Sequence, residues 1–265
     1  MMVRVGLAIV LLTALAASFG PLLTPYDPTA QELARRLEGP SLAHPFGLDE
    51  LGRDILARLL SGARISLLVG LAVVSVSSTV GMLLGSIAGY FGGAVDDVNS
   101  RIVDVLMAFP GILLAIALVA VLGPSLTNVV LALSVIGWVG YARLVRSQAL
   151  RAREFEFVQA ARALGAGAPR IVLRHVLPTA LPAVVVQATL GMAGAIIAEA
   201  ALSFLGLGVQ PPTPSWGTML DAGRSHLFDA PHLTIFPGLA IALLVLGFNF
   251  LGDGLRDRVD PKLAR

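Results

Sequence analysis

Long apolar stretches separated by short polar segments dominate the sequence. Six of them are long enough to cross a hydrocarbon core as a helix, which takes about 20 residues. They are too long and too uniformly apolar for barrel strands, and a helix satisfies its own backbone amides in lipid. We therefore predict an all-α integral membrane protein with six transmembrane helices, at about 5–23, 65–90, 102–122, 126–144, 181–204 and 233–251.

The first apolar stretch has two interpretations. Arg4, a short apolar run and the sequence Ala14-Leu15-Ala16 resemble a signal peptide with its cleavage site. The apolar run continues past that site to Leu23, however, which favours a helix that is retained as a membrane anchor.

Composition supports a membrane protein and leaves little room for enzymatic chemistry. Only 14% of the 265 residues are charged and 56% are hydrophobic, whereas soluble domains have about 25% charged residues. The absence of cysteine excludes disulfides, thiol nucleophiles and cysteine zinc sites. The single lysine, Lys262, is not part of a phosphate-binding GxxxxGK[ST] loop. His226 and His232, near Asp221 and Asp229, match no metal-binding spacing, so we expect solvated loop histidines, no metal site and no cofactor.

Basic residues predict the orientation of the chain. With six spans, 13 of the 19 lysines and arginines lie on the side of the N-terminus and of the segments after spans two, four and six. By the positive-inside rule, that side and both termini are cytoplasmic. In a membrane protein such residues set orientation, so we expect no nucleic-acid partner.

Two features within the spans concern helix packing. Gly81, Gly85 and Gly89 form a ridge of small residues on which another helix can pack closely, either within this chain or in another subunit. Pro110 lies near the start of span three and should bend it, either as a packing kink or as a hinge.

Few charged residues lie in or beside the spans. Glu199 is in span five, where a carboxylate normally faces the protein interior or a water-filled path, so we regard it as a possible residue of the path or its outer gate. The alternative is a structural acid that pairs with a partner subunit. Asp97 and Asp104 lie four and three residues from Arg101, and we expect them to stabilise a helix end.

The cytoplasmic segment at about 152–180 predicts a short helix, a tight turn and a second helix outside the membrane. Gly165 is placed to end the first helix, and Pro169 suits the first turn of the second. Either another protein or the lipid surface could cover the apolar face of the first helix. The residues on that face are Phe157, Ala160, Ala161 and Leu164, with Gln159 and Arg162 turned away from it.

This segment resembles the EAA loop of ABC importer permeases, in which EAA is followed at fixed spacing by glycine and then by I-x-L-P. Gln159 replaces the acid and His175 the isoleucine, but the spacing is intact. The resemblance implies that the segment is the coupling helix that docks on an ATPase subunit. Its matching residues are Gln159, Ala160, Ala161, Gly165, Leu177 and Pro178.

Further motifs extend the resemblance over nearly the whole chain. HPFG, DELGRDILARLLSGARISL, GYFGGAVDD, RIVDVLMAFPGILLAIALVAVLG, AEAALSFLGLGVQPPTPSWG and LGDGLRDRVDP are similar to the C-type subunit of dipeptide and oligopeptide permeases. The resemblance implies the type I ABC importer (MetI-like) permease fold, with an N-terminal helix and periplasmic loop at 1–61, a permease domain at 62–253 and a cytoplasmic tail at 254–265. The family also transports nickel, glutathione and oligosaccharides, so the substrate stays open.

The resemblance also implies partners in a prokaryotic inner membrane. These are a B-type permease, two ATPase subunits that bind ATP and magnesium, and a periplasmic substrate-binding protein. The rival hypothesis is a secondary transporter or channel that is not driven by ATP. Such a protein should have several ionisable residues at mid-membrane, and Glu199 is the only acid deep in a predicted span.

Overall fold

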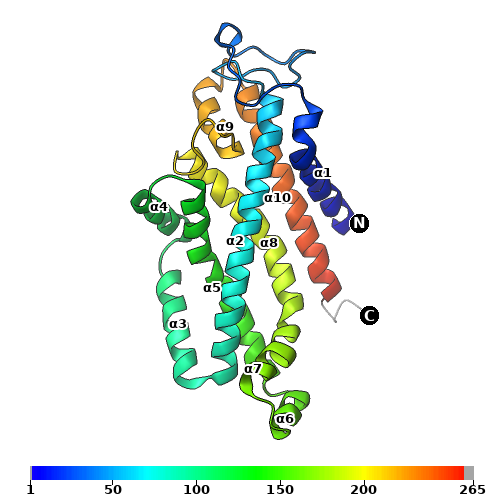
Figure 1. Ribbon diagram of the computed structural model, residues 1–265, viewed down its shortest axis with the longest axis vertical. Helices are drawn as coiled ribbons and strands as arrows, with labels where there is room; N and C mark the ends of the chain where they lie inside the picture. The colour runs from blue at the N-terminus through cyan, green and yellow to red at the C-terminus, as the bar shows by residue number, and fades with distance from the viewer. Residues whose placement is uncertain (1, 260–265) are drawn as a thin grey trace.

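The computed structural model describes residues 2–259, and within this range the chain is helical, with no β-strand (Figure 1). Five helices are long and apolar enough to cross a membrane, and a bent helix pair brings the number of possible spans to six, which agrees with the predicted fold class. The five are α1 (Met2–Leu23), α2 (Ile55–Phe91), α5 (Leu126–Ala152), α8 (Leu177–Phe204) and α10 (His232–Val259).

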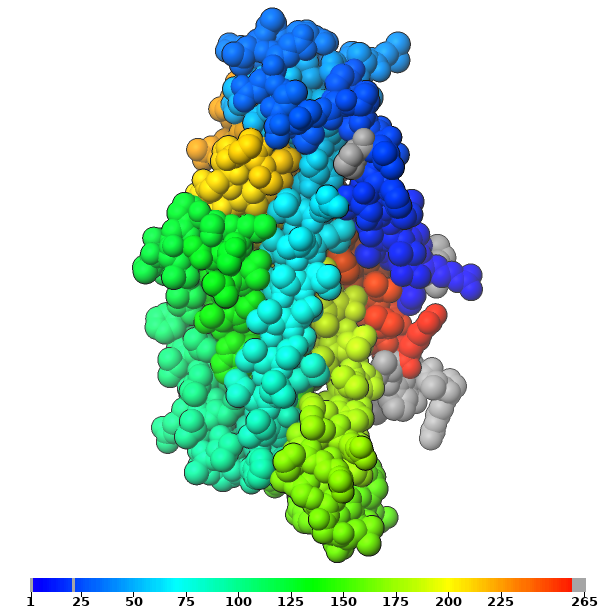
Figure 2. Space-filling view, viewed as in Figure 1, coloured from blue at the N-terminus to red at the C-terminus, as the bar shows by residue number. Residues whose placement is uncertain are grey.

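Four helices, α2, α5, α8 and α10, are longer than the roughly 20 residues that a membrane crossing requires. The 37 residues of α2 make a helix of about 55 Å, against a hydrocarbon core of about 30 Å. In Figure 1, α2, α5 and α8 reach further down than α1 and α10, away from the folded loop at the top. Their lower ends therefore extend beyond the level at which α1 begins and α10 ends. Figure 2 shows the segment around α6 (Glu156–Ala163) and α7 (Ala168–Ile171) projecting at this lower end.

The predicted ridge of glycines packs within the chain, against α5. A Cβ atom at Gly81 would lie 2.6 Å from the carbonyl oxygen of Trp138, and one at Gly89 would lie 2.7 Å from the Cβ of Ala149. Gly85 is equally close to Ala142. Glycine at these three positions allows α2 and α5 to approach closely, which is the first of the two arrangements that the sequence left open.

Glycines also join the first and last helices. A Cβ atom at Gly6 would lie 2.6 Å from the carbonyl oxygen of Gly247 and 2.7 Å from the amide nitrogen of Leu251. About one turn earlier in α1, Val3 lies against Gly254 of α10. The predicted anchor helix is thus packed along α10 through backbone contacts that larger side chains would prevent.

The expectation of one helix over 102–122 is wrong. The chain forms α3 (Gly93–Met107) and α4 (Gly111–Leu122), which meet at an angle of 85°. Pro110 is the N-cap of α4, and it disfavours helical backbone at the preceding residue, so the helix is broken rather than bent. The 12 residues of α4 make about 18 Å of helix, too short to span a membrane alone.

Ion pairing at the lower end also differs from the prediction. Among the described residues, Asp97 and Asp104 form no ion pair with Arg101. Instead Asp96, one residue earlier, accepts two hydrogen bonds from Arg146 of α5, one of 2.6 Å from its Nη2 atom. The ion pair therefore joins α3 to α5 rather than stabilising one helix end.

The loop between α1 and α2 is held together by buried charged groups at the upper end of the molecule. It contains the short helix η1 (Leu33–Arg35). The side chain of Asp54 caps α2 by accepting a 2.7 Å hydrogen bond from the amide of Ala57, and it lies 2.8 Å from Nδ1 of His44. Asp49 accepts a 2.7 Å hydrogen bond from Nε of Arg53. The DELGRD motif thus builds the start of α2 and the loop above it.

Trp216 ties the second upper loop to α2. It begins α9 (Trp216–Gly223), which is followed by η3 (Arg224–His226). Its ring is buried, and Nε1 donates a 2.9 Å hydrogen bond to the carbonyl of Leu59. Gly62 leaves room for the ring, because a Cβ atom there would lie 2.8 Å from it. Trp216 is therefore part of the interior of the chain.

Candidate coupling and translocation site

The projecting helix α6 ends where the sequence predicted, at Gly165. This residue has φ +80°, a left-handed conformation that glycine adopts without the clash of a Cβ atom. Its amide donates to the carbonyl of Arg162, and the next amide, of Ala166, donates to Ala161, each at 3.0 Å. These two hydrogen bonds form a Schellman motif, which reverses the chain toward α7.

A small apolar core holds α6 against the rest of the molecule. Val158 is fully buried, and it belongs to a cluster with residues at the end of α5 and with Ile171 and Val176. Tyr90, at the end of α2, packs against this cluster, and the guanidinium of Arg162 lies 5.5 Å from the centre of its ring. The orientation of α6 therefore depends on the ends of α2 and α5.

The exposed face of α6 consists of Phe157, Ala160 and Leu164. Leu164 is 88% exposed and Phe157 48% exposed, an unusual state for large apolar side chains. The sequence predicted Ala161 on this face, and that prediction is wrong. Ala161 is half-buried against the core cluster. Gln159 is exposed, and its side-chain amide donates a 3.2 Å hydrogen bond to the carbonyl of Glu154.

The second predicted helix is not separate from the span that follows. Pro169 is in the first turn of α7, as expected, but α7 continues through η2 (Val172–Val176), a wide π-helical turn, directly into α8. Pro178 is in the first turn of α8, and its ring would clash with the carbonyl of Arg174 in a regular α-helix. The wider turn gives room for that ring. Leu177 packs inward, beside Tyr141.

Glu199 is enclosed by this chain. Its side chain is fully buried and accepts hydrogen bonds from Ser203 at 2.7 Å and from Ser66 of α2 at 3.2 Å. Among the described residues no arginine pairs with it. The carboxyl group thus joins α8 to α2 through hydroxyl groups, and its role in a path or gate stays a prediction.

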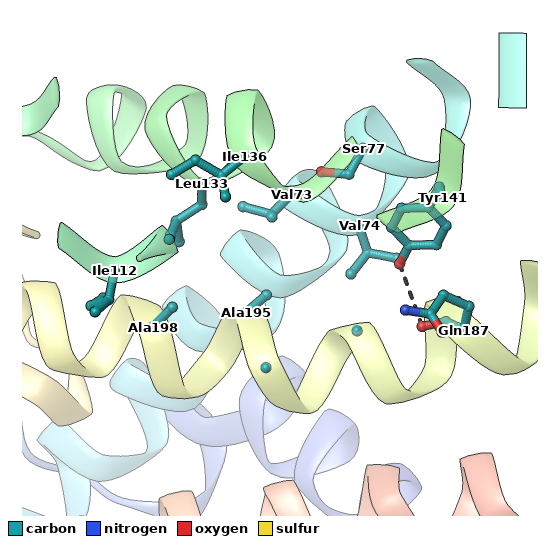
Figure 3. Close-up of a pocket in the computed structure, with 14 residues that line it drawn as sticks. Val73, Val74, Ser77, Ile112, Leu133, Ile136, Tyr141, Gln187, Ala195 and Ala198 are labelled. Carbon is teal, nitrogen blue, oxygen red and sulfur yellow. Dashed lines mark hydrogen bonds between the residues drawn. The ribbon is translucent and has the colours of Figure 1, made fainter. Parts of the chain in front are cut away.

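A cavity of about 280 Å³ lies among α2, α4, α5 and α8, at the height of the predicted spans (Figure 3). Ser77, Tyr141 and Gln187 gather at one end of it, and Ile112 and Leu133 lie toward the other. Sequence reasoning missed this site, although a signal was present. Gln187 is an uncharged polar residue within an apolar stretch, and intramembrane polar residues tend to be functional.

The loop histidines show no arrangement for a metal ion. No group of three potential ligands is close enough within residues 2–259. His226 lies 2.9 Å from Asp229, and this hydrogen bond lowers the pKa of the Asp229 carboxyl group. His232 is buried rather than solvated as expected, and its Nε2 lies 3.3 Å from the carbonyl of Leu48.

Comparisons with known proteins bear on both ends of the chain. Residues 81–265 match the family described as binding-protein-dependent transport system inner membrane component. Residues 1–40 match the N-terminal TM domain of oligopeptide transport permease C. The resemblance inferred from the sequence motifs is therefore confirmed.

Individual relatives cover almost the whole chain. It is 49% identical over 259 residues to the dipeptide transport system permease protein DppC of Alkalihalophilus pseudofirmus, covering 98% of this chain and 85% of that protein. It is 48% identical over 262 residues to the glutathione transport system permease protein GsiD of Pectobacterium atrosepticum, covering 98% and 87%. The protein of the same name from Escherichia coli is 48% identical over 255 residues, covering 96% and 84%.

These relatives are transport permeases rather than enzymes, and the apolar helices agree with a location in the inner membrane. The chain belongs to the family of binding-protein-dependent transport system inner membrane components, as a permease subunit of an ABC importer.

Proposed function

We propose that this chain is the C-type permease of an importer for dipeptides or related small peptides, and that α6 is its docking surface for an ATPase subunit. The observation that carries the proposal is the exposed apolar face of Phe157, Ala160 and Leu164 at the projecting end of the molecule. Relatives named as dipeptide and glutathione permeases support a peptide substrate.

The rest of the assembly follows from this proposal. A B-type permease forms the other half of the path, two ATPases bind ATP and magnesium below, and a periplasmic binding protein delivers the substrate above. This chain holds no cofactor. The end that bears α6 is cytoplasmic, as are both termini, in agreement with the distribution of basic residues.

The contacts of α6 also suggest how movement reaches the membrane. Val158 fixes α6 to the ends of α2 and α5, and α7 continues into α8 without a break. A displacement of α6 would therefore move three membrane helices together, as rigid-body rocking of a permease requires. A secondary transporter would have no use for such a projecting surface.

Two substitutions at Ala160 distinguish docking from contact with lipid. If a protein surface packs closely on α6, tryptophan at this position overlaps with it, whereas serine keeps the size. If α6 rests on the lipid surface, tryptophan at this position should be the better tolerated of the two substitutions, because it strengthens membrane contact whereas serine weakens it. Ala160 is a better position than Ala161, because Ala161 packs within the chain.

The measurement is co-purification of the ATPase subunits, with ATP-driven peptide uptake in proteoliposomes that contain the complete importer. We expect Ala160→Trp to lose both while Ala160→Ser keeps both, at equal membrane abundance. Retention of both activities by Ala160→Trp would show that the docking surface is elsewhere. ATP-independent uptake by this chain alone would instead support a secondary transporter.

A further inference from the structure

The cavity among α2, α4, α5 and α8 has a polar end and an apolar end (Figure 3). None of the residues that line it is charged. Its volume of about 280 Å³ is close to the lower end of the range for small-ligand sites. A neutral part of a ligand fits this lining better than a charged terminus, which would be left without a partner of opposite charge.

The polar end contains a hydroxyl group without a hydrogen-bond partner. Ser77 is 1% exposed, and its Oγ atom contacts no donor or acceptor among residues 2–259. Buried polar groups normally have partners, so an unpartnered one that lines a cavity indicates a group that arrives from outside. Gln187 lines the same end of the cavity, and its side-chain amide can both donate and accept; the hydroxyl of Tyr141 lies 3.5 Å from the main-chain carbonyl of Gln187.

One glycine of the lining, Gly194, borders open space. At Gly194 in α8 a Cβ atom would meet nothing within 4 Å, so packing inside the chain does not require glycine there. Glycine within a helix is less favourable than alanine, which makes an unexplained one informative. Gly194 lines the cavity, so a larger side chain at this position begins in open space at the cavity's edge. Contacts within the chain account for two other glycines of the lining, because a Cβ atom at Gly137 would overlap Oγ of Ser77 and one at Gly191 would overlap the hydroxyl of Tyr141.

We propose that this cavity is a subsite for the transported peptide, in which Gln187 and Ser77 hydrogen-bond a main-chain amide and the apolar end receives an apolar side chain. The proposal rests on the proposed function, because it assumes that peptides pass along this face. An amide group presents one donor and one acceptor, which matches the two polar side chains. The apolar end, which includes Ile112, Leu133 and Ile136, provides a surface for one side chain rather than for a whole peptide.

The test compares two dipeptides, Gly-Gly and Gly-Phe, in proteoliposomes with the complete importer and saturating binding protein. Gly194→Leu fills the apolar end, so it should lower uptake of Gly-Phe by roughly ten- to hundredfold relative to Gly-Gly. The matched control is Ile197→Phe, which adds bulk to an exposed position of the same helix outside the cavity. It should leave the ratio of the two uptake rates unchanged.

A second variant tests the polar end and does not depend on the first one folding. Ser77→Ala removes a hydroxyl that has no partner in the chain, so thermal stability should not fall, while uptake of both dipeptides should fall severalfold. A purely structural hydroxyl would give the opposite result, with lower stability and unchanged uptake per folded importer.

Photo-crosslinking identifies the occupant directly. With p-benzoylphenylalanine in place of Ile112, labelled Gly-Phe should crosslink to this chain during ATP hydrolysis. Crosslinking to the other permease alone, or equal effects of Gly194→Leu on both dipeptides, would mean that the cavity is filled by the partner subunit and would overturn the proposal. If the wild-type importer moves neither dipeptide with ATP, the proposed function itself fails, and this result is distinct from a change in selectivity.

Discussion

Replacing Glu199 by alanine should destabilise the protein strongly. The side chain is fully buried and accepts hydrogen bonds from Ser203 and Ser66. Its removal leaves a cavity of about 50 Å³, which costs about 1 kcal/mol at about 24 cal/mol per Å³. Each lost hydrogen bond adds about 1–2 kcal/mol, because the two hydroxyl groups stay buried without their acceptor. We therefore expect a loss of about 3–5 kcal/mol.

Glutamine at the same position is the matched control. It keeps the shape of the side chain and a carbonyl oxygen that accepts from a hydroxyl group, so the loss for Glu199→Gln should be much smaller than for alanine. The assay is thermal unfolding of the detergent-solubilised subunit, together with its abundance in the membrane. Uptake is then measured per folded importer, which separates stability from transport.

One result would refute this reasoning, and another would give the carboxyl group a role in transport. If Glu199→Ala unfolds at the same temperature as the wild type, the hydrogen bonds to Ser66 and Ser203 do not hold α8 to α2. If Glu199→Gln is as stable as the wild type but transports nothing, the carboxyl group acts in the path or gate, as the sequence first suggested, and its burial describes only one state of the transport cycle.

Two further predictions concern helix packing and topology. Gly85→Leu should reduce the amount of folded protein, because a Cβ atom there lies 3.0 Å from the Cα atom of Ala142 and overpacking costs roughly 1–3 kcal/mol or more. Gly238→Leu in α10 should be tolerated better in the same abundance assay, because a Cβ atom there makes only an ordinary contact, 3.9 Å from the side chain of Leu220. Thr213 and Arg151 are both exposed and belong to segments at opposite ends of the molecule. Single cysteines at these two positions should therefore react with a membrane-impermeant thiol reagent from opposite sides of the membrane. Labelling of both in intact spheroplasts would contradict the six-span topology.

Much of the fold was predictable from the sequence because lipid constrains the backbone so strongly. An apolar stretch of about 20 residues in a membrane has to be a helix, so the presence of the long helices followed from hydropathy. Local signals were equally direct. Gly165 ends α6 because glycine readily adopts the left-handed backbone found there, and Pro169 lies in the first turn of α7 because its fixed φ suits that position; neither effect depends on distant contacts.

Side-chain environments were less predictable. The ring of Trp216 is buried, and it donates a hydrogen bond to the carbonyl of Leu59, which lies more than 150 residues earlier in the chain. His232 was expected to be solvated and is enclosed beside the first loop. The burial of these side chains depends on which distant segments pack together, and the hydropathy pattern of one sequence does not determine that.

The sequence by itself determined that the chain is a helical membrane protein with a helix-turn-helix segment outside the membrane at about 152–180. Hydropathy sets the long helices, and glycine and proline set the turn, through effects on nearby backbone alone. Only the tertiary structure decided that Ala161 faces inward, that Pro110 separates two helices at 85° and that Ser77 and Gln187 line one cavity. Each of these depends on the packing of helices that are distant in sequence. The angle after Pro110, for example, depends on where α4 rests against α5, a contact that proline permits but does not specify.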